Sequence, residues 1–347
     1  MSAAGDPTPA VTVSITGVGF ARCPSPEAIS LTELVFEASA AALADAGLRR
    51  ADIDGVCLAA SDQLDARAIS SMQLAGPAGG YLQDEIKVGD DGSLAFATAV
   101  LRIEAGADRR VLAVSWTKES ESGLEMALGV NAEPVYTRPA GLHPLVAEAA
   151  VTASFLDRAG VPAPAGEASE FSCWPLRHSD FPAPTDAAVA LVLSEGPGPV
   201  EVAGLAWETE VADPTARRLP PEAAVAAVVA KASAEAGVVI DGSVVIETTD
   251  RTPYRLAMTL AGFGLLPGRQ VRLPSPELTP AMLGAAPANV NPSGGLRASN
   301  PVYAAGLERV AHAALAVRAG APVAVAHSSY GYAGQGQFVT ILRAGAK

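Results

Sequence analysis

Residues 40–48 of this chain read Ala-Ala-Ala-Leu-Ala-Asp-Ala-Gly-Leu and lead into Ile-Asp-Gly-Val-Cys-Leu at 53–58. Residues 229–238 read Val-Ala-Lys-Ala-Ser-Ala-Glu-Ala-Gly-Val and lead into Ile-Asp-Gly-Ser-Val-Val-Ile at 240–246. In each stretch a helical pattern ends at a glycine and an apolar strand pattern follows. The two stretches predict the same helix and the same strand, once in each half of the chain.

A second pair of stretches repeats in the same order. Residues 99–107 read Ala-Val-Leu-Arg-Ile-Glu-Ala-Gly-Ala before an apolar run at 111–114, and residues 314–321 read Ala-Leu-Ala-Val-Arg-Ala-Gly-Ala before a run at 323–326. Two matches in the same order indicate an internal duplication. We therefore expect a disordered N-terminus at 1–10 and two related halves of one body, at 11–198 and 199–347.

Composition favours an α/β fold. Ala, Gly and Val are abundant, aromatic residues make up only 5% of the 347 residues, and helical patterns alternate with short apolar runs. Runs of this kind are typical of buried, parallel strands covered on both faces. The main helices are expected at 31–46, 92–105, 221–236 and 304–319. The glycines at 17 and 19 are expected to close the first strand, and the prolines that follow argue against a dinucleotide-binding turn.

Charge and cysteine content exclude several classes of function. A net charge of −13 repels phosphate backbones, and no basic stripe offsets it, so nucleic acid is not an expected partner. Three cysteines without metal-like spacing fit a reducing cytosol and predict no metal site. The first ten residues lack the pattern of a signal peptide, and no apolar run is long enough to span a membrane. We expect a cytoplasmic protein that does not bind membranes.

Four further motifs lie in a fixed order along nearly the whole chain. Residues 43–55 hold Leu-Ala-Asp-Ala-Gly-Leu and then Asp-Ile-Asp-Gly, and residues 185–190 read Thr-Asp-Ala-Ala-Val-Ala. Residues 290–296 read Val-Asn-Pro-Ser-Gly-Gly-Leu, and residues 298–306 lead into a helix that ends in Arg-Ala-Gly at 318–320. With these motifs the sequence resembles the thiolase superfamily, specifically its lipid-transfer-protein-like branch. The resemblance implies a thiolase-like fold of two duplicated halves, layered αβαβα.

The resemblance also shows which catalytic groups are missing. Thiolases carry a nucleophilic Cys in the pattern Cys-x-Ser-Gly, and this chain has Gly89 at that position, followed by Asp90 and Asp91. Their Gly-His-Pro is Ser-Asn-Pro here, so Asn300 replaces the imidazole, and counting back from the last Gly-rich turn places Tyr330 at the second Cys. No covalent acyl-enzyme can form at Gly89. The CoA-binding lid looks shortened, at about 117–170.

Each candidate residue has a functional and a structural interpretation. In the functional one, backbone N–H groups near Gly89 and the amide of Asn300 hold an oxyanion, while Tyr330 moves a proton with help from His327 or Asp250. Further pocket residues are expected at the two helix entries and in the Gly-rich turn: Asp90, Asp91, Tyr303 and Gly334. Arg251 and Arg297 flank the expected pocket, and in the functional interpretation they hold a phosphate or a carboxylate. In the structural interpretation the aspartates cap a helix, the tyrosines are buried, His327 is a core residue and these arginines are solvated.

Three functions remain open from the sequence. The first is an enzyme, of the acyltransferase or aldolase-type lyase class, that binds an acyl thioester on CoA or a carrier and makes or breaks a carbon–carbon bond without a covalent intermediate. The second is a catalytically silent subunit of a thiolase-like or ketosynthase-like complex. The third is an acyltransferase with a displaced nucleophile such as Cys173.

No cofactor is expected to be bound permanently. A homo- or heterodimer through a sheet edge is expected, and the resemblance adds a small OB-fold protein as a possible partner.

Overall fold

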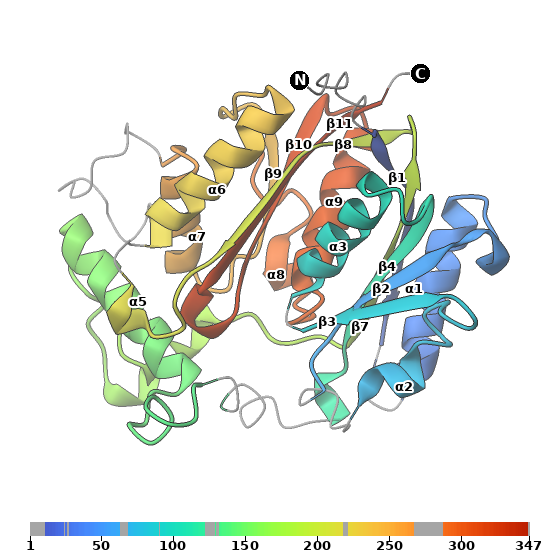
Figure 1. Cartoon of the computed structure of the whole chain (residues 1–347). Coiled ribbons are helices and arrows are strands. Elements are labelled where there is room, and N and C mark those ends of the chain that lie inside the picture. Colours follow the sequence, from blue (N-terminus) through green and yellow to red (C-terminus); the bar gives the residue numbers. More distant parts are fainter. Residues whose placement is uncertain are drawn as a thin grey trace, which may run out of the picture.

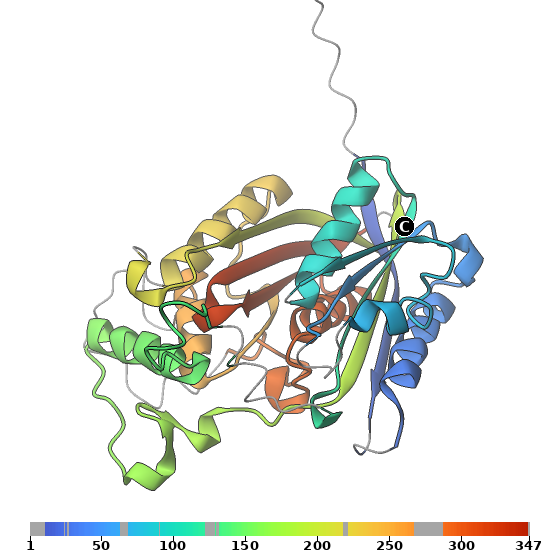
Figure 2. The same ribbon diagram turned by 60° about the horizontal axis from the view of Figure 1, so that its bottom comes forward.

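A nine-stranded sheet organises the molecule. The computed structural model describes residues 11–23, 25, 28–62, 69–89, 91–121, 129, 132–217, 221–266 and 287–345. Within these residues the strands lie in the following order: β3 (Asp84–Val88), β2 (Gly55–Ala59), β4 (Arg110–Thr117), β7 (Ala187–Glu195), β1 (Val13–Arg22), β8 (Val200–Thr209), β11 (Gly336–Ala344), β10 (Val323–Tyr330) and β9 (Val245–Thr248). Strands β1 and β8 join two half-sheets, which diverge from this junction in Figure 2.

The two half-sheets have the same topology, as the duplication predicts. In the first half β1 pairs with β7, β7 with β4, β4 with β2 and β2 with β3. In the second half β8 pairs with β11, β11 with β10 and β10 with β9, and a parallel bridge from Ile246 to Val290 takes the place of the β2–β3 pair. Corresponding pairs run in the same sense, so each half is one copy of a common unit.

Helices complete a five-layered α/β structure (Figure 1). Helices α3 (Gly92–Glu104) and α9 (Ala305–Arg318) lie side by side between the half-sheets. Helices α1 (Leu31–Asp45) and α2 (Ser70–Leu74) lie on the outer side of one half-sheet, and α6 (Pro221–Ala236) and α7 (Pro253–Gly262) on the outer side of the other. The observed layering is therefore αβαβα, which confirms the expected fold class.

Small side chains let the two central helices approach each other. The central core includes Ala95 and Ala99 of α3 together with Ala311 and Ala314 of α9, all of them fully buried. Close packing of such helices between two sheets removes a large apolar area from water, and that area is the main source of stability. The same packing fixes where the helices begin, and so positions the site described below.

A separate segment follows β4. It contains helix α5 (Pro144–Ala159) and a small hairpin of β5 (Phe171–Cys173) and β6 (Leu176–Arg177). The short helix α8 (Gly295–Ala298) precedes α9. Helix α5 packs against α7 and against the turn at 332–334, so this segment lies near the end of β10.

Two expectations from the sequence are wrong. The sheet is mixed rather than parallel, because β7 and β11 run antiparallel to both of their neighbours. The prediction was wrong because an apolar run indicates only that both faces of a strand are buried. It does not indicate whether the strand runs parallel or antiparallel to its neighbours. The first strand also continues past Gly17 and Gly19 to Arg22. These glycines are needed for close packing: an added Cβ at either would lie 2.2 Å from a carbonyl oxygen of α1.

The helices at 31–46, 92–105, 221–236 and 304–319 are confirmed to within one residue at each end. The expected N-terminal segment 1–10 and most of the proline-rich connection after 265 lie outside the described residues. Among the helices that the structure describes, none combines the length and apolar character that a membrane crossing requires.

Candidate functional site

The N-termini of the two central helices meet. The backbone N–H of Gly92, the first residue of α3, donates to the carbonyl oxygen of Tyr303, just before α9, at 2.7 Å. An added Cβ at Gly92 would lie 2.8 Å from Cβ of Leu307. The convergence expected from the duplication is therefore present, and it brings two positive helix ends to one point.

A carboxylate occupies this junction. Asp91 is the N-cap of α3, its Oδ1 accepts the N–H of Ser93 at 2.8 Å, and only 2% of the residue is exposed. The hydroxyl of Ser328 on β10 donates to the same oxygen at 3.2 Å, and the hydroxyls of Ser93 and Ser328 lie 2.8 Å apart. Both the cap and the pocket interpretations of Asp91 therefore fit the structure.

Burial raises the pKa of the Asp91 carboxyl. Bonds from Ser93 and Ser328 and the nearby cation of Arg251 favour the ionised form but offset this effect only in part. A carboxyl with a raised pKa holds its proton more tightly than an exposed one, and the corresponding carboxylate is a stronger base. A carboxyl in this position can therefore accept a proton and return it.

The N–H groups at the start of α3 already have partners in the protein. Gly92 donates to Tyr303, Ser93 to the Asp91 side chain and Leu94 to the Asp91 carbonyl. We expected N–H groups at this helix end that are free to bind a substrate oxyanion. The N–H groups of residues 92–94 are not free, because each already has an acceptor within the protein. Gly89 is exposed, and an added Cβ there would meet no described atom within 4 Å. Asp90, the other aspartate of the pair, lies outside the described residues.

His327 is a neutral core residue. The side-chain amide of Gln337 donates to Ser329 and to the carbonyl of Gly334, so its oxygen is left to accept the Nε2–H of His327 at 3.0 Å. Nδ1 of the imidazole then accepts the hydroxyl of Thr248 at 2.7 Å. The ring is fully buried, and burial lowers the pKa of His327 to about 4. Both ring nitrogens of His327 therefore have hydrogen-bond partners within the protein.

Tyr330 lies on the opposite face of the same strand. Side chains alternate along β10, so Tyr330 shares the inner face with Ser328, while His327 packs on the outer side against Phe263. The Tyr330 hydroxyl lies 3.3 Å from Oγ1 of Thr209 on β8, and the residue is 4% exposed. The structure therefore does not bring His327 to Tyr330, but it places Tyr330 in the same layer as Asp91.

Asp250 and Asn300 join loops around the junction. Oδ1 of Asp250 accepts the N–H of Leu296 in α8 at 2.7 Å, and burial raises the pKa of this carboxyl. Nδ2 of Asn300 donates to the carbonyl of Pro182 at 3.1 Å, and its backbone N–H donates to Thr185. The Asp250 carboxylate therefore binds the backbone of the segment before α9. The Asn300 side chain uses one amide hydrogen for Pro182 and has a second one.

The remaining predicted pocket residues have backbone roles. The backbone N–H of Tyr303 donates to the hydroxyl of Thr117, and its carbonyl receives Gly92. Gly334 has a φ of +65°, and an added Cβ there would lie 2.8 Å from Nη1 of Arg255. Tyr303 therefore fixes the start of α9, and Gly334 makes room for a buried guanidinium group.

Sequence reasoning missed four polar residues of the site: Ser93, Ser328, Glu148 and Arg255. Arg255 of α7 forms a buried pair with Glu148 of α5, with N–O distances of 3.0 and 2.6 Å. Alternation along the strand that became β10 could have placed Ser328 on the inner face with Tyr330. No local signal marks the Arg255–Glu148 pair, because its members are far apart in the sequence and meet only in the folded chain.

None of the three cysteines belongs to this junction. Cys23 follows β1, Cys57 lies within β2 and Cys173 in β5. Cys57 is fully buried, and burial raises the pKa of its thiol to about 12, which leaves it unreactive. In the part of the chain that the structure describes, no group of three or more His, Cys, Asp or Glu side chains could hold a metal ion.

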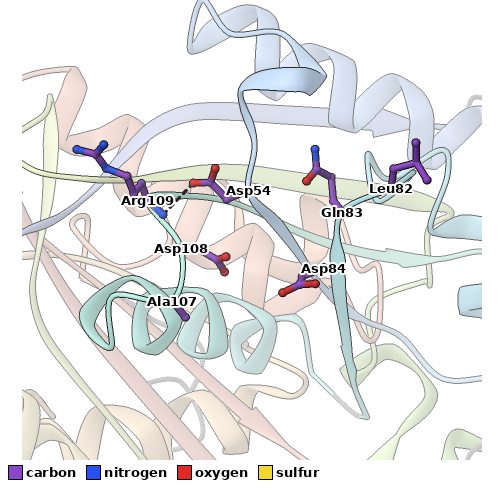
Figure 3. Close-up of a pocket in the computed structure, with 7 residues that line it drawn as sticks. All are labelled: Asp54, Leu82, Gln83, Asp84, Ala107, Asp108 and Arg109. Atoms are coloured by element: carbon purple, nitrogen blue, oxygen red, sulfur yellow. Dashed lines mark hydrogen bonds between the residues drawn. The ribbon is translucent and has the colours of Figure 1, made fainter.

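An open surface depression of about 570 Å³ lies at the other end of α3 (Figure 3). Its acidic lining residues already have partners: Asp54 accepts the N–H groups of Arg109 and Arg110, and Asp84 and Asp108 both pair with Arg102. The depression is therefore unconnected with the chemistry at the N-terminus of this helix.

Comparison with solved structures shows the fold. The structure titled "Ltp2-ChsH2(DUF35) aldolase" matches with a TM-score of 0.70 and 17% identity over 96% of this chain and 98% of that chain. Acetyl-CoA acetyltransferase from Syntrophomonas wolfei matches with a TM-score of 0.64 and 14% identity over 96% and 99%. Human mitochondrial 3-ketoacyl-CoA thiolase in complex with CoA matches with a TM-score of 0.65 and 11% identity over 97% and 98%. No protein-family model and no curated protein matches the sequence.

Proposed function

Because this chain has the thiolase fold, we propose that it binds an acyl thioester and makes or breaks a carbon–carbon bond without a covalent intermediate. One observation carries the proposal: the group at the junction of the two central helices is the buried carboxylate of Asp91, and the thiol that the superfamily pattern expects is absent. A carboxylate cannot hold the acyl group as a stable thioester, but it can move protons.

In the proposed reaction, the Asp91 carboxylate removes a proton from the α-carbon of the thioester. The resulting enolate attacks a carbonyl carbon of a second substrate, and a new carbon–carbon bond forms. Tyr330 donates its hydroxyl proton to the alkoxide that develops on that carbonyl, and the proton on Asp91 returns to Tyr330 through solvent or through the hydroxyl of Ser328. Cleavage of a β-hydroxyacyl thioester is the same sequence in reverse.

The placement of three groups supports these roles. Asp91 contacts Ser328, and Tyr330 lies two residues further along the same face of β10. Asn300 has one amide hydrogen that is not used by Pro182 and could bind the enolate oxygen together with backbone N–H groups near Gly89. Both ring nitrogens of His327 and Oδ1 of Asp250 have structural partners, so we give these residues positioning roles only.

Turnover of a β-hydroxyacyl-CoA by the purified chain tests the proposal. We expect formation of a shorter acyl-CoA and a carbonyl product. Removal of a general acid or base costs about 10²- to 10⁴-fold in rate, so Asp91→Asn and Tyr330→Phe should each fall in this range. Asp84→Asn is the matched control, because this aspartate is exposed and lies at the sheet edge. Detection of an acyl–protein adduct by mass spectrometry would instead favour a displaced cysteine nucleophile.

A second candidate is a catalytically silent subunit of a thiolase-like complex. It is favoured by the closed state of the junction, in which Asp91, Ser328 and Tyr330 are at most 4% exposed. This candidate predicts no turnover by the chain alone, and turnover only with a cysteine-containing subunit of the same fold. Full activity of the isolated chain, with the Asp91 dependence given above, would exclude it.

We further propose a dimer through β3. This strand is at the end of the sheet order, and the exposed side chains of Met72, Tyr81 and Leu82 lie in the segment that precedes it. Unpaired strand edges tend to be covered by association. The DUF35 partner in the name of the aldolase also makes a small second protein a proposed partner here. Sedimentation of the purified chain tests the dimer. We expect a dimer, and a monomer would show that the β3 edge is left uncovered.

A further inference from the structure

Three arginines gather around Glu148 in this acidic chain. Arg217 precedes α6, Arg251 follows β9, and Arg255 lies in the first turn of α7. All three lie close to the carboxylate of Glu148: burial would raise the pKa of Glu148, but the three guanidinium groups hold it below its ordinary value. Glu148 therefore faces three cations, and Glu210 and Asp91 act on Arg217 and Arg251 respectively, in a protein whose net charge is −13.

Arg217 and Arg255 meet at the turn after β10. Arg217 donates to the carbonyl oxygens of Tyr332 and Ala333 at 2.6 and 2.9 Å, and Nη2 of Arg255 lies 3.4 Å from the same Ala333 oxygen. Two like charges on one carbonyl repel each other when they are partly removed from water. Burial accordingly lowers the pKa of Arg217. An anion at this place would relieve the repulsion.

Arg255 has a donor without a partner. Its Nε and Nη2 bind Glu148, but its Nη1 is buried and makes no hydrogen bond to a described residue, while the whole residue is 3% exposed. Buried charged donors are nearly always satisfied in native proteins, and an unsatisfied one is costly. Nη1 therefore marks a place where an acceptor is expected.

The charge of Arg251 acts on the Asp91 carboxyl at the junction. The residue is half-buried, follows Asp250 directly, and makes no hydrogen bond or ion pair with any described residue. The same charge acts on Glu148, so Arg251 lies within electrostatic reach of both carboxylates. The next residue, Thr252, caps α7 and fixes the backbone at this point. Arg251 is thus held beside the site with its guanidinium donors unused.

We propose that Arg251, together with Nη1 of Arg255, binds an oxyanion of the substrate: a carboxylate at the far end of the acyl chain or a phosphate of the carrier arm. This inference rests on the proposed acyl-thioester function and names the class of thioester that the site takes. A guanidinium binds both anions through two parallel N–H donors, which an ammonium group cannot do. The site therefore selects acidic over neutral substrates.

Calorimetric titration with four probes tests the proposal and separates the two anions. Glutaryl-pantetheine carries the carboxylate alone, and glutaramoyl-phosphopantetheine carries the phosphate alone. Glutaramoyl-pantetheine carries neither, and free glutarate reports anion binding without a thioester. The Arg251→Gln variant removes the charge, and Arg251→Lys keeps the charge but not the paired donors. Arg109→Gln, at the far end of α3, is the matched control. Because Arg251 has no partner among the described residues, its variants should fold normally.

We expect one of the two anionic thioesters to bind roughly 10- to 100-fold more tightly than the neutral one, and Arg251→Gln to abolish this difference. Arg251→Lys should restore it only in part. Equal binding of all three thioesters would overturn the inference and leave the proposed function standing. Binding of glutarate that depends on Arg251, without binding of any thioester, would sustain the anion site and remove the thioester function. No binding of any probe would overturn both.

Discussion

The carboxylate of Asp91 lies directly against the backbone of Gly306: an added Cβ at Gly306 would fall 1.7 Å from Oδ1. Asp91 caps the first central helix and Gly306 is the second residue of the other, so this contact joins the two repeats at their helix ends. Glycine is required because any side chain would occupy the place of the carboxylate. The contact explains how a single acidic group can sit between two helix N-termini that would otherwise face each other.

Replacement of Gly306 by Ala tests this contact through protein stability. In an exposed helix such a change stabilises by roughly 0.5–1 kcal/mol, but here it forces a steric clash, and overpacking of a core costs about 1–3 kcal/mol. We expect a lower free energy of unfolding in urea. Gly242→Ala is the control, since an added Cβ there meets nothing within 4 Å. In the double variant with Asp91→Ser most of the loss should be recovered, and a purely additive loss would contradict the contact.

Stability should depend on pH through Asp91. Burial raises the pKa of this carboxyl in the folded state, so the folded state binds the proton more tightly than the unfolded state. The stabilisation it gives is present below the ordinary pKa of 3.8 and is lost as the pH rises through the raised value. Asp91→Asn keeps the cap but has no charge to bury. The variant should therefore gain stability relative to the wild type as the pH rises above about 4, and a constant difference across pH would contradict this.

His327 should have the opposite effect. Burial lowers its pKa from 6.5 to about 4, so its stabilisation is present above pH 6.5 and is lost as the pH falls toward 4. The loss amounts to about 3 kcal/mol, at 1.36 kcal/mol per pH unit. His327→Gln should abolish this slope between pH 6.5 and 4 in urea titrations, while the pH dependence of turnover above pH 6.5 stays unchanged. A change in the turnover profile would show that His327 does carry a proton.

The sequence predicted the fold from its repeats, because each helix ends in the same glycine signal before a strand. It also predicted that the helices beginning at Gly92 and near Ala304 converge, since equivalent helices in a duplicated fold point to one place. Strand β3 was not predicted, because its polar residues at a sheet edge leave no apolar run.

The candidate site was predicted less well. The positions of His327 and Tyr330 differ by three, an odd number, so alternation along a strand already places them on opposite faces, and their expected partnership ignored this parity. The hydrogen bond from the Leu296 N–H to Asp250 joins residues 46 positions apart, so no local pattern indicated it. The sequence did indicate Asp91 as a pocket residue. Its contact with Ser328 could not be predicted, because the two residues are 237 positions apart and no local pattern links them.

The buried pair of Arg255 and Glu148 should couple the segment after β4 to the second half. Removal of one member of such a pair leaves an unpaired buried charge and costs about 3–5 kcal/mol. We expect a loss of this size for Arg255→Met in urea unfolding. The double variant Arg255→Met with Glu148→Leu should recover much of it, because no charge is then left buried. Equal losses in the single and double variants would show that shape and not charge governs this contact.

Exchange of the α-hydrogens of a bound acyl thioester in deuterated water measures the central claim most directly, since it reports enolate formation without any second substrate. Asp91→Asn is compared with the wild type and with Asp84→Asn by mass spectrometry of the recovered thioester and of the intact protein. We expect exchange in the wild type and in Asp84→Asn, exchange at least about 100-fold slower in Asp91→Asn, and no acyl adduct on the protein. Unchanged exchange in Asp91→Asn, or an acyl group attached to a cysteine, would contradict it.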